Sequence, residues 1–142
     1  MRESRVRVDG EIVGETAAGL LALVGVATGD DETDAVALAE KLLHLRIFAD
    51  DDGKMNRSLL DTHGALGVVS QFTLLGDCRR GRRPSYGRAA EPEEAERLIG
   101  VLVERARALG AEVATGRFGA RMSVELVNDG PVTLRVDTRR EF

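Results

Sequence analysis

Nine consecutive residues without a polar side chain, GLLALVGVA at residues 19–27, place the tightest constraint on how this chain can fold. A strand that is apolar on both faces has to be covered on both faces, so it belongs in the middle of a sheet. The run ALGVV at residues 65–69 is apolar and β-rich in the same way. The sequence therefore predicts a core that is built on two buried strands.

The segments around these runs alternate between strand and helix patterns. RVRV and EIVGE are joined by the dipeptide Asp9-Gly10, which is typical of a hairpin turn. Apolar residues then recur at helical spacing over residues 29–48, after a group of acidic residues that suits a helix N-terminus. A second helix is predicted from Pro92 to about Leu109, where Gly110 ends it.

The last third of the chain predicts three more strands, in EVATG, RMSVELV and VTLRVD. The predicted order is three strands, a helix, two strands, a helix and three strands. This order predicts an α+β fold with residues 1–142 as a single domain. Two helices would pack on a mostly antiparallel sheet that curls toward a barrel.

Composition limits the class of protein further. The chain has 142 residues, of which 43% are hydrophobic, which is enough for one core and too many for a disordered chain. No apolar run is long enough to cross a bilayer, and the first residues, MRESRVRV, contain no signal-peptide core. We therefore expect a cytoplasmic protein with no membrane partner.

Cysteine and histidine are too sparse to suggest a metal site. Cys78 is the only cysteine, so it cannot form an internal disulfide. His44 and His63 are the only histidines and lie far apart in the sequence. No cluster has the spacing of metal ligands, so we expect neither a metal nor a cofactor.

The segment RRGRRPSYGR, residues 79–88, is basic although the net charge of the chain is −4. Its glycines and proline predict a loop. One interpretation is a solvated loop. The other is a surface for the phosphates of RNA or a nucleotide, because guanidinium groups bind phosphate oxygens in pairs. The candidate phosphate contacts are Arg79, Arg80, Arg82 and Arg83.

Polar residues interrupt the strand pattern in SQFTLLG, residues 70–76. Ser70, Gln71 and Thr73 surround Phe72 directly after a buried apolar run. Burying a polar side chain without a hydrogen-bond partner is unfavourable. Three such side chains at one end of a buried strand therefore indicate a candidate site.

NDGPVT, residues 128–133, has strong turn chemistry between two predicted strands. It is either a plain hairpin turn, or a turn whose Gly130–Pro131 bond is cis and directs backbone carbonyls toward a ligand.

The familiar catalytic motifs are missing from the sequence. It has no G-x-S-x-G elbow, no phosphate-binding loop and no dinucleotide fingerprint. Neither histidine lies near a serine that could act as its partner nucleophile. An enzyme of this kind needs a substrate that is already reactive, such as an activated ester, and acts by positioning and by backbone donors.

Four segments together resemble the D-aminoacyl-tRNA deacylase family: LRIFADDDGKMNRSLLD, VVSQFTLLGD, RRGRRPSY and TGRFGARMSVELVNDGPVT. They occur in one register from about Val6 to the last predicted strand. The resemblance implies a tRNA-editing hydrolase that works as a homodimer with its active site at the subunit interface. The substrate it implies is the acceptor end of a tRNA that carries a D-amino acid on its terminal adenosine.

The resemblance also implies roles for particular residues. The catalytic motif corresponds to Ser70, Gln71, Phe72 and Thr73. The partner subunit would contribute a Gly-cisPro pair that reads chirality, and this pair and its neighbours correspond to Gly130, Pro131, Asn128, Val132 and Thr133. Phe118 and Met122 would line the adenosine pocket, although they are equally consistent with the hydrophobic core.

A mechanism with few side chains follows from this assignment. The hydroxyl of Thr73 has no visible base and is a poor nucleophile. We therefore expect the backbone N–H groups of Phe72 and Thr73 to hold the ester carbonyl, while the 2′-hydroxyl of the terminal ribose places or activates water. The carbonyls of Gly130 and Pro131 would crowd the direction that an L side chain takes. Glycine has no side chain to reject, so we expect glycyl-tRNA to be cleaved as well.

The sequence departs from the family in one respect. Family members usually carry Gln-Arg-Val in a strand segment before the point where this chain starts, and that arginine braces the Gly-Pro loop. Either the start of the sequence was assigned too late, or the N-terminal strand is truly shortened. Two other functions remain open: a noncatalytic RNA- or nucleotide-binding dimer, and a hydrolase of other acylated small molecules.

Overall fold

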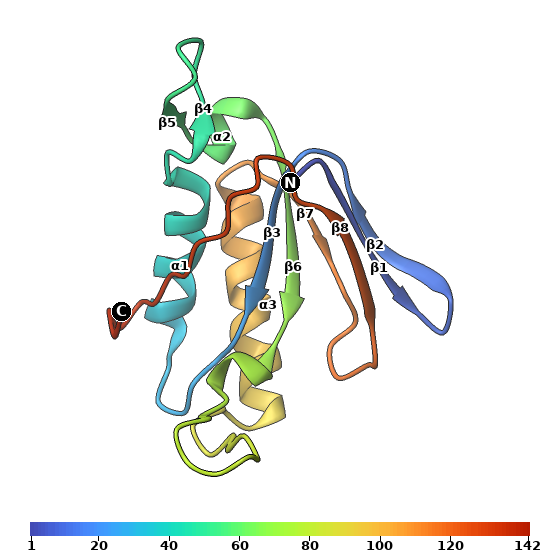
Figure 1. Ribbon diagram of the computed structural model, residues 1–142, viewed down its shortest axis with the longest axis vertical. Helices are drawn as coiled ribbons and strands as arrows, with labels where there is room; N and C mark the ends of the chain where they lie inside the picture. The colour runs from blue at the N-terminus through green and yellow to red at the C-terminus, as the bar shows by residue number, and fades with distance from the viewer.

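The computed structural model describes residues 1–142 and has three layers (Figure 1). Helices form one outer layer, a parallel sheet lies in the middle, and an antiparallel sheet forms the other outer layer. The elements in chain order are β1 (Glu3–Val8), β2 (Glu11–Thr16), β3 (Gly19–Val24), α1 (Glu32–His44), β4 (Phe48–Ala49), β5 (Met55–Arg57), α2 (Leu59–Thr62), β6 (Ala65–Ser70), the 3₁₀ turn η1 (Phe72–Leu75), α3 (Pro92–Ala108), β7 (Glu112–Thr115) and β8 (Ser123–Val127).

The middle sheet is parallel, with the strand order β3-β6-β7. The α+β class is confirmed, but the prediction of a barrel-like sheet is wrong, because the sheets do not close, and the sheet that the helices cover is parallel rather than antiparallel. The reason is visible in the connections. A helix lies between β3 and β6 and another between β6 and β7, and a helical crossover returns the chain in the same direction.

The outer sheet is antiparallel, with the strand order β2-β1-β8. The predicted hairpin between β1 and β2 is confirmed. Its two turn residues, Asp9 and Gly10, have φ angles of 51° and 80°. Positive φ at both positions is the mark of a type I′ turn, which matches the right-handed twist of paired strands.

Helices α1 and α3 cover the free face of the parallel sheet, close to where the sequence predicts them. The N-terminus of α1 is capped by Asp31 and Asp34, each of which accepts a hydrogen bond from the other's backbone N–H. Leu43 in α1, Leu66 in β6 and Leu102 in α3 are all essentially buried and join the layers in one hydrophobic cluster. None of the helices combines the length and the apolar character that crossing a bilayer requires.

Residues 128–142 form no strand, so the strand predicted in VTLRVD is absent. Residues 128–136 make no backbone–backbone hydrogen bond, because β8 pairs with β1 and the chain then leaves the sheet toward α1 (Figure 1). The end of this tail is fixed by side chains instead. Arg139 donates to the carboxylate of Asp34 at 2.9 Å, and this hydrogen bond lowers the pKa of Asp34.

Candidate active site

The polar residues that follow the apolar run 65–69 lie where β6 ends and the chain leaves the sheet. Ser70 is the last residue of β6 and lies opposite Val24 of β3. The N–H of Gln71 donates to the carbonyl of Val24 at 2.8 Å, after which the chain leaves the sheet and forms η1. The side-chain amide of Gln71 donates to the hydroxyl of Thr73. The predicted catalytic residues therefore form a turn at the C-terminal end of a buried parallel strand.

This turn presents two backbone donors. The first hydrogen bond inside it runs from the N–H of Leu74 to the carbonyl of Gln71, at 3.2 Å. The N–H groups of Phe72 and Thr73 precede that bond, so they have no acceptor within the turn. Both residues are exposed. The turn can therefore offer two neighbouring N–H groups to an oxygen of a ligand.

A loop that is rich in arginine packs against the same turn. Asp77 and Ser85 close the base of this loop with two backbone hydrogen bonds of 2.7 and 2.9 Å. The ring of Tyr86 meets the ring of Phe72 edge to face, with centroids 5.2 Å apart. Both rings keep exposed surface, 57% for Phe72 and 39% for Tyr86.

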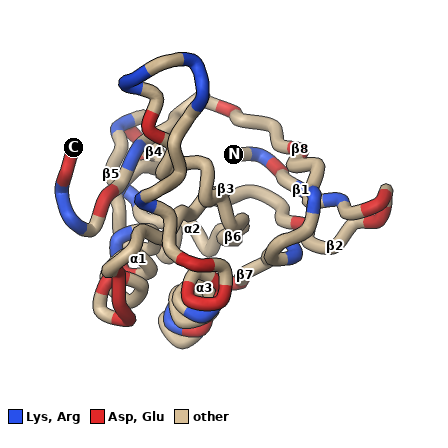
Figure 2. Tube along the Cα trace, turned by 90° about the horizontal axis from the view of Figure 1, so that it is seen from below, with Lys and Arg blue, Asp and Glu red and all other residues tan.

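The arginines of the loop fall into two groups. The first group is bound to carboxylates: Arg88 pairs with Glu141 at 2.8 Å, and Arg79 binds Asp77 at 2.7 Å. The hydrogen bond from Arg79 lowers the pKa of Asp77 to about 2. The other group consists of Arg80, Arg82 and Arg83, which are exposed and make no ion pair. Figure 2 shows basic residues at the bend where this loop projects from the body.

Gly130 and Pro131 lie in the turn that follows β8. Across this turn the side-chain amide of Asn128 donates to the hydroxyl of Thr133 at 3.1 Å. The expected cis bond is not found, because the structure contains no cis peptide bond. Trans is the lower-energy form by about 0.5–1 kcal/mol unless packing selects cis, and Pro131 is exposed.

The two halves of the predicted site lie at opposite ends of the sheets within one subunit (Figure 1). Ser70 is at the C-terminal end of β6. The turn after β8 is next to the N-terminus of the chain, where Arg2 pairs with Val127 and Met1 pairs with Gly19 at the start of β3. The length of β6 separates these ends by roughly 17 Å at the usual rise of a strand.

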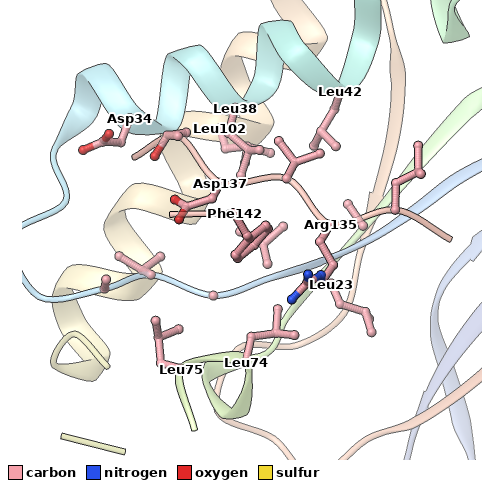
Figure 3. Close-up of a pocket in the computed structure, with 18 of the residues that line it drawn as sticks. Leu23, Asp34, Leu38, Leu42, Leu74, Leu75, Leu102, Arg135, Asp137 and Phe142 are labelled. Carbon is pink, nitrogen blue, oxygen red and sulfur yellow. The ribbon is translucent and has the colours of Figure 1, made fainter. Parts of the chain in front are cut away.

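A cleft of about 810 Å³ opens between β3, α1, η1 and the tail (Figure 3). Leu23, Leu38 and Leu74 line its apolar walls, and Asp34 and Asp137 lie toward one end. Few of the predicted site residues line it: Arg79, Asn128, Val132 and Thr133. Ser70–Thr73 and Gly130–Pro131 are outside its lining. Residues 132–139 approach β3 here without pairing with it, which leaves the cleft between them.

Phe118 and Met122 lie away from this cleft. Phe118 is half-buried and packs against the hydrophobic core. Met122 packs over Gly116, where an added Cβ atom would come within 2.7 Å of its sulfur. Their role in an adenosine pocket stays a prediction.

Two contacts at the site have no clear signal in the sequence. One is the contact between Phe72 and Tyr86, which depends on the path of the arginine-rich loop. The other is the ion pair of Arg2 with Asp129, at 2.8 Å, which joins the chain's first residues to its last turn. No group of three or more His, Cys, Asp or Glu side chains is placed to share a metal ion.

Comparison with known proteins identifies the family to which the chain belongs. The family model described as D-Tyr-tRNA(Tyr) deacylase matches residues 1–137. A D-aminoacyl-tRNA deacylase of Symbiobacterium thermophilum is 56% identical over 139 residues, which cover 98% of this chain and 92% of that protein. One of Heliobacterium modesticaldum is 57% identical over 95% of this chain and 90% of that protein. The chain belongs to the D-aminoacyl-tRNA deacylase family, whose members are hydrolases.

Solved structures share the fold. The c-Myc DNA unwinding element binding protein superimposes with a TM-score of 0.91 and 31% identity, over 96% of this chain and 93% of the other. A probable eukaryotic D-amino acid tRNA deacylase superimposes with a TM-score of 0.73 over 88% of each chain. Its identity is 16%, so it supports the fold alone.

Proposed function

We propose that this chain is a tRNA-editing hydrolase, which cleaves the ester between a D-amino acid and the terminal adenosine of tRNA. The observation that carries the proposal is the turn Ser70–Thr73, which presents two free backbone N–H groups at the end of β6 in a chain of this family. An aminoacyl ester is activated already, so it suits a site that has donors and no side-chain base.

In the proposed reaction, water adds to the ester carbonyl carbon. The N–H groups of Phe72 and Thr73 stabilise the negative charge that develops on the carbonyl oxygen. The bond between that carbon and the ribose oxygen then breaks, and the ribose oxygen takes a proton. The products are the free D-amino acid and a tRNA with its terminal hydroxyl restored. The neighbouring 2′-hydroxyl of the ribose would place the water.

The site would be completed by a second copy of the chain. Within one copy, Gly130–Pro131 and Ser70–Thr73 lie at opposite ends of the sheets, so they cannot enclose one ligand. A homodimer resolves this if the turn after β8 of one copy reaches η1 of the other. The main chain of Gly130 and Pro131, flanked by Asn128, Val132 and Thr133, would then occupy the space that an L side chain needs. Such a site has no means of excluding glycine, so glycyl-tRNA would also be a substrate.

Other contacts to the tRNA would come from the arginine-rich loop and from the segment between β7 and β8. Arg80, Arg82 and Arg83 are free to bind phosphates, whereas Arg79 is already held by Asp77. Phe118 and Met122 would contact the adenosine. An enzyme with this substrate belongs in the cytoplasm, where tRNA is charged and used, and needs no cofactor for ester hydrolysis.

The proposal is tested by incubating the purified protein with D-Tyr-tRNA, L-Tyr-tRNA and glycyl-tRNA at matched concentrations. We expect rapid loss of the D ester, slower loss of the glycyl ester and no loss of the L ester beyond spontaneous hydrolysis. Equal rates for the D and L esters would contradict the chirality filter. An untouched glycyl ester would contradict the account of how the filter works.

A second candidate function is nucleic-acid binding without hydrolysis. The likeness to the c-Myc DNA unwinding element binding protein, at 31% identity, favours it. Tight binding of D-Tyr-tRNA with no loss of the ester would support this function. Hydrolysis of free D-tyrosine esters as fast as of D-Tyr-tRNA would instead indicate a hydrolase of small acylated molecules.

A further inference from the structure

The exposed aromatic pair at the catalytic turn, Phe72 and Tyr86, has no further partner within one copy of the chain. Phe72 and Tyr86 contact each other, yet 57% of Phe72 and 39% of Tyr86 remain exposed. Large aromatic side chains usually bury most of their surface. An exposed pair at a candidate site therefore indicates a binding surface for a ligand with a flat apolar face.

The pair is held firmly enough to serve as a platform. The loop that carries Tyr86 is closed at its base by the two backbone hydrogen bonds between Asp77 and Ser85. The ring of Tyr86 also packs over Gly76, where an added Cβ atom would lie only 3.0 Å from the ring. A ring that is fixed before a ligand arrives loses little conformational entropy on binding.

Free positive charge lies on the same loop. Arg80, Arg82 and Arg83 come three to six residues before Tyr86, and none of them forms an ion pair. Aromatic faces that stack bases, next to arginines that follow a phosphate backbone, are the combination that binds single-stranded nucleic acid. Bases inside a duplex are stacked on both faces, so they cannot reach the pair.

We propose that Phe72 and Tyr86 form a stacking site for an unpaired base of single-stranded RNA, with the adjoining phosphates on Arg80, Arg82 and Arg83. This inference rests on the proposed function for its ligand, which is the single-stranded 3′ end of tRNA. The terminal adenosine carries the ester and goes to the catalytic turn. The base that stacks on this pair is therefore one of the unpaired nucleotides before it.

The chain offers a direct probe of the stacking site. It contains one tyrosine and no tryptophan, so its intrinsic fluorescence comes from Tyr86. A base stacked on the Tyr86 ring quenches this emission. The experiment titrates the protein with an uncharged single-stranded RNA oligonucleotide that ends in CCA, corrects for absorption by the RNA, and follows binding in parallel by the anisotropy of a labelled copy. A blunt RNA duplex of the same composition is the control.

We expect the oligonucleotide to quench the fluorescence in a saturable way, with weaker binding at higher salt, and the duplex to quench it little. The variants Tyr86→Leu and Tyr86→Phe separate stacking from packing, because both keep an apolar side chain and only phenylalanine keeps the ring. Tyr86→Leu should weaken binding about tenfold, whereas Tyr86→Phe should bind much as the unaltered protein does. Ile12→Ala, at an exposed apolar residue of β2 far from this loop, and Lys41→Ala, at an exposed cation of α1, are matched controls.

The proposal is overturned if the oligonucleotide fails to bind, if it binds without quenching, or if Tyr86→Leu binds as well as the unaltered protein. The proposed dimer brings the partner's turn after β8 to η1, so the stacking site requires that the ring of Tyr86 stay open in the dimer. Shielding of Tyr86 from a soluble quencher as protein concentration rises without RNA would overturn it. Hydrolysis of D-Tyr-tRNA is measured separately. Loss of quenching with intact hydrolysis rejects only the stacking site, and quenching without hydrolysis rejects only the proposed function.

Discussion

Arg2 donates a hydrogen bond from Nη2 to Oδ2 of Asp129 at a distance of 2.8 Å. The backbone N–H of Arg2 also donates to the carbonyl of Val127 at 2.8 Å. The turn that carries Gly130 and Pro131 is therefore tied to the residue that precedes β1. In the proposed dimer, this contact fixes the direction in which the turn enters the partner's site.

Replacing Asp129 with alanine should lower chiral discrimination more than stability. The side chains of the pair are 66% and 59% exposed, so its loss should change the free energy of unfolding by less than about 1 kcal/mol. The ratio of initial rates on D-Tyr-tRNA and L-Tyr-tRNA should nevertheless fall several-fold, because the turn loses its brace. Arg2→Lys, which keeps the charge, is the control, and an unchanged ratio for Asp129→Ala would show that the pair has no positioning role.

Replacing Phe72 with proline tests the backbone donor in the catalytic turn. Proline is well tolerated at the first position of a helical turn, and it removes the N–H of Phe72. We expect kcat for D-Tyr-tRNA to fall by about 10²–10³, the usual cost of one oxyanion donor. Phe72→Ala removes the same ring and keeps the N–H, so it should raise KM with a much smaller effect on kcat. Equal kcat values for the two variants would contradict a role for this N–H.

The carboxyl group of Asp77 should titrate with a midpoint near 2. Its pKa is lowered from an ordinary 3.8 to about 2, mainly by the hydrogen bond from the side chain of Arg79. Because the folded pKa is depressed, the contact stabilises the folded loop above about pH 4, and the stabilisation is lost as the pH falls through about 2. The carboxyl ¹³C shift measured by NMR reports this midpoint. Arg79→Gln should return it toward 3.8, and a midpoint near 3.8 in the unaltered protein would contradict the contact.

The parallel strand that delivers Ser70 should dominate stability. Leu66 of β6 is essentially buried in the hydrophobic cluster, so Leu66→Ala should lower the free energy of unfolding by about 2–5 kcal/mol. Leu126 of β8 is 47% exposed, and Leu126→Ala should cost less than about 1 kcal/mol. Denaturant titration of the two variants compares them, and similar losses would contradict the assignment of the core.

The elements that the sequence predicts well are those with local signals. Periodic leucines and first-turn acids predict α1, and Pro92 marks the start of α3. Strand direction is less local, because the apolar runs that became β3 and β6 look the same in a parallel or an antiparallel sheet. The helices between these strands indicate the direction, because a helical crossover joins parallel strands. The short helix α2 was signalled only by the Ser58 and Asp61 capping pair.

The same distinction between local and non-local signals applies to the candidate site. Its residues were identified by motif, but the end of β6 at Ser70 and the turn that follows it depend on where the sheet stops. The strand predicted over residues 132–137 failed because a strand requires a neighbour, and no segment of this chain pairs with it. The contact of Phe72 with Tyr86 joins residues fourteen positions apart, and only the closed base of the loop brings them together.

The most direct test of a site shared between two subunits is complementation between two inactive variants. Phe72→Pro disables the donor half, and Gly130→Leu places a bulky side chain in the half that reads chirality. If each site combines Ser70–Thr73 of one copy with Gly130–Pro131 of the other, a mixed dimer contains one intact site. Mixing the two variants under conditions that exchange subunits should then restore about a quarter of the normal D-Tyr-tRNA hydrolysis. Exchange of subunits with no recovery of activity would contradict the shared site.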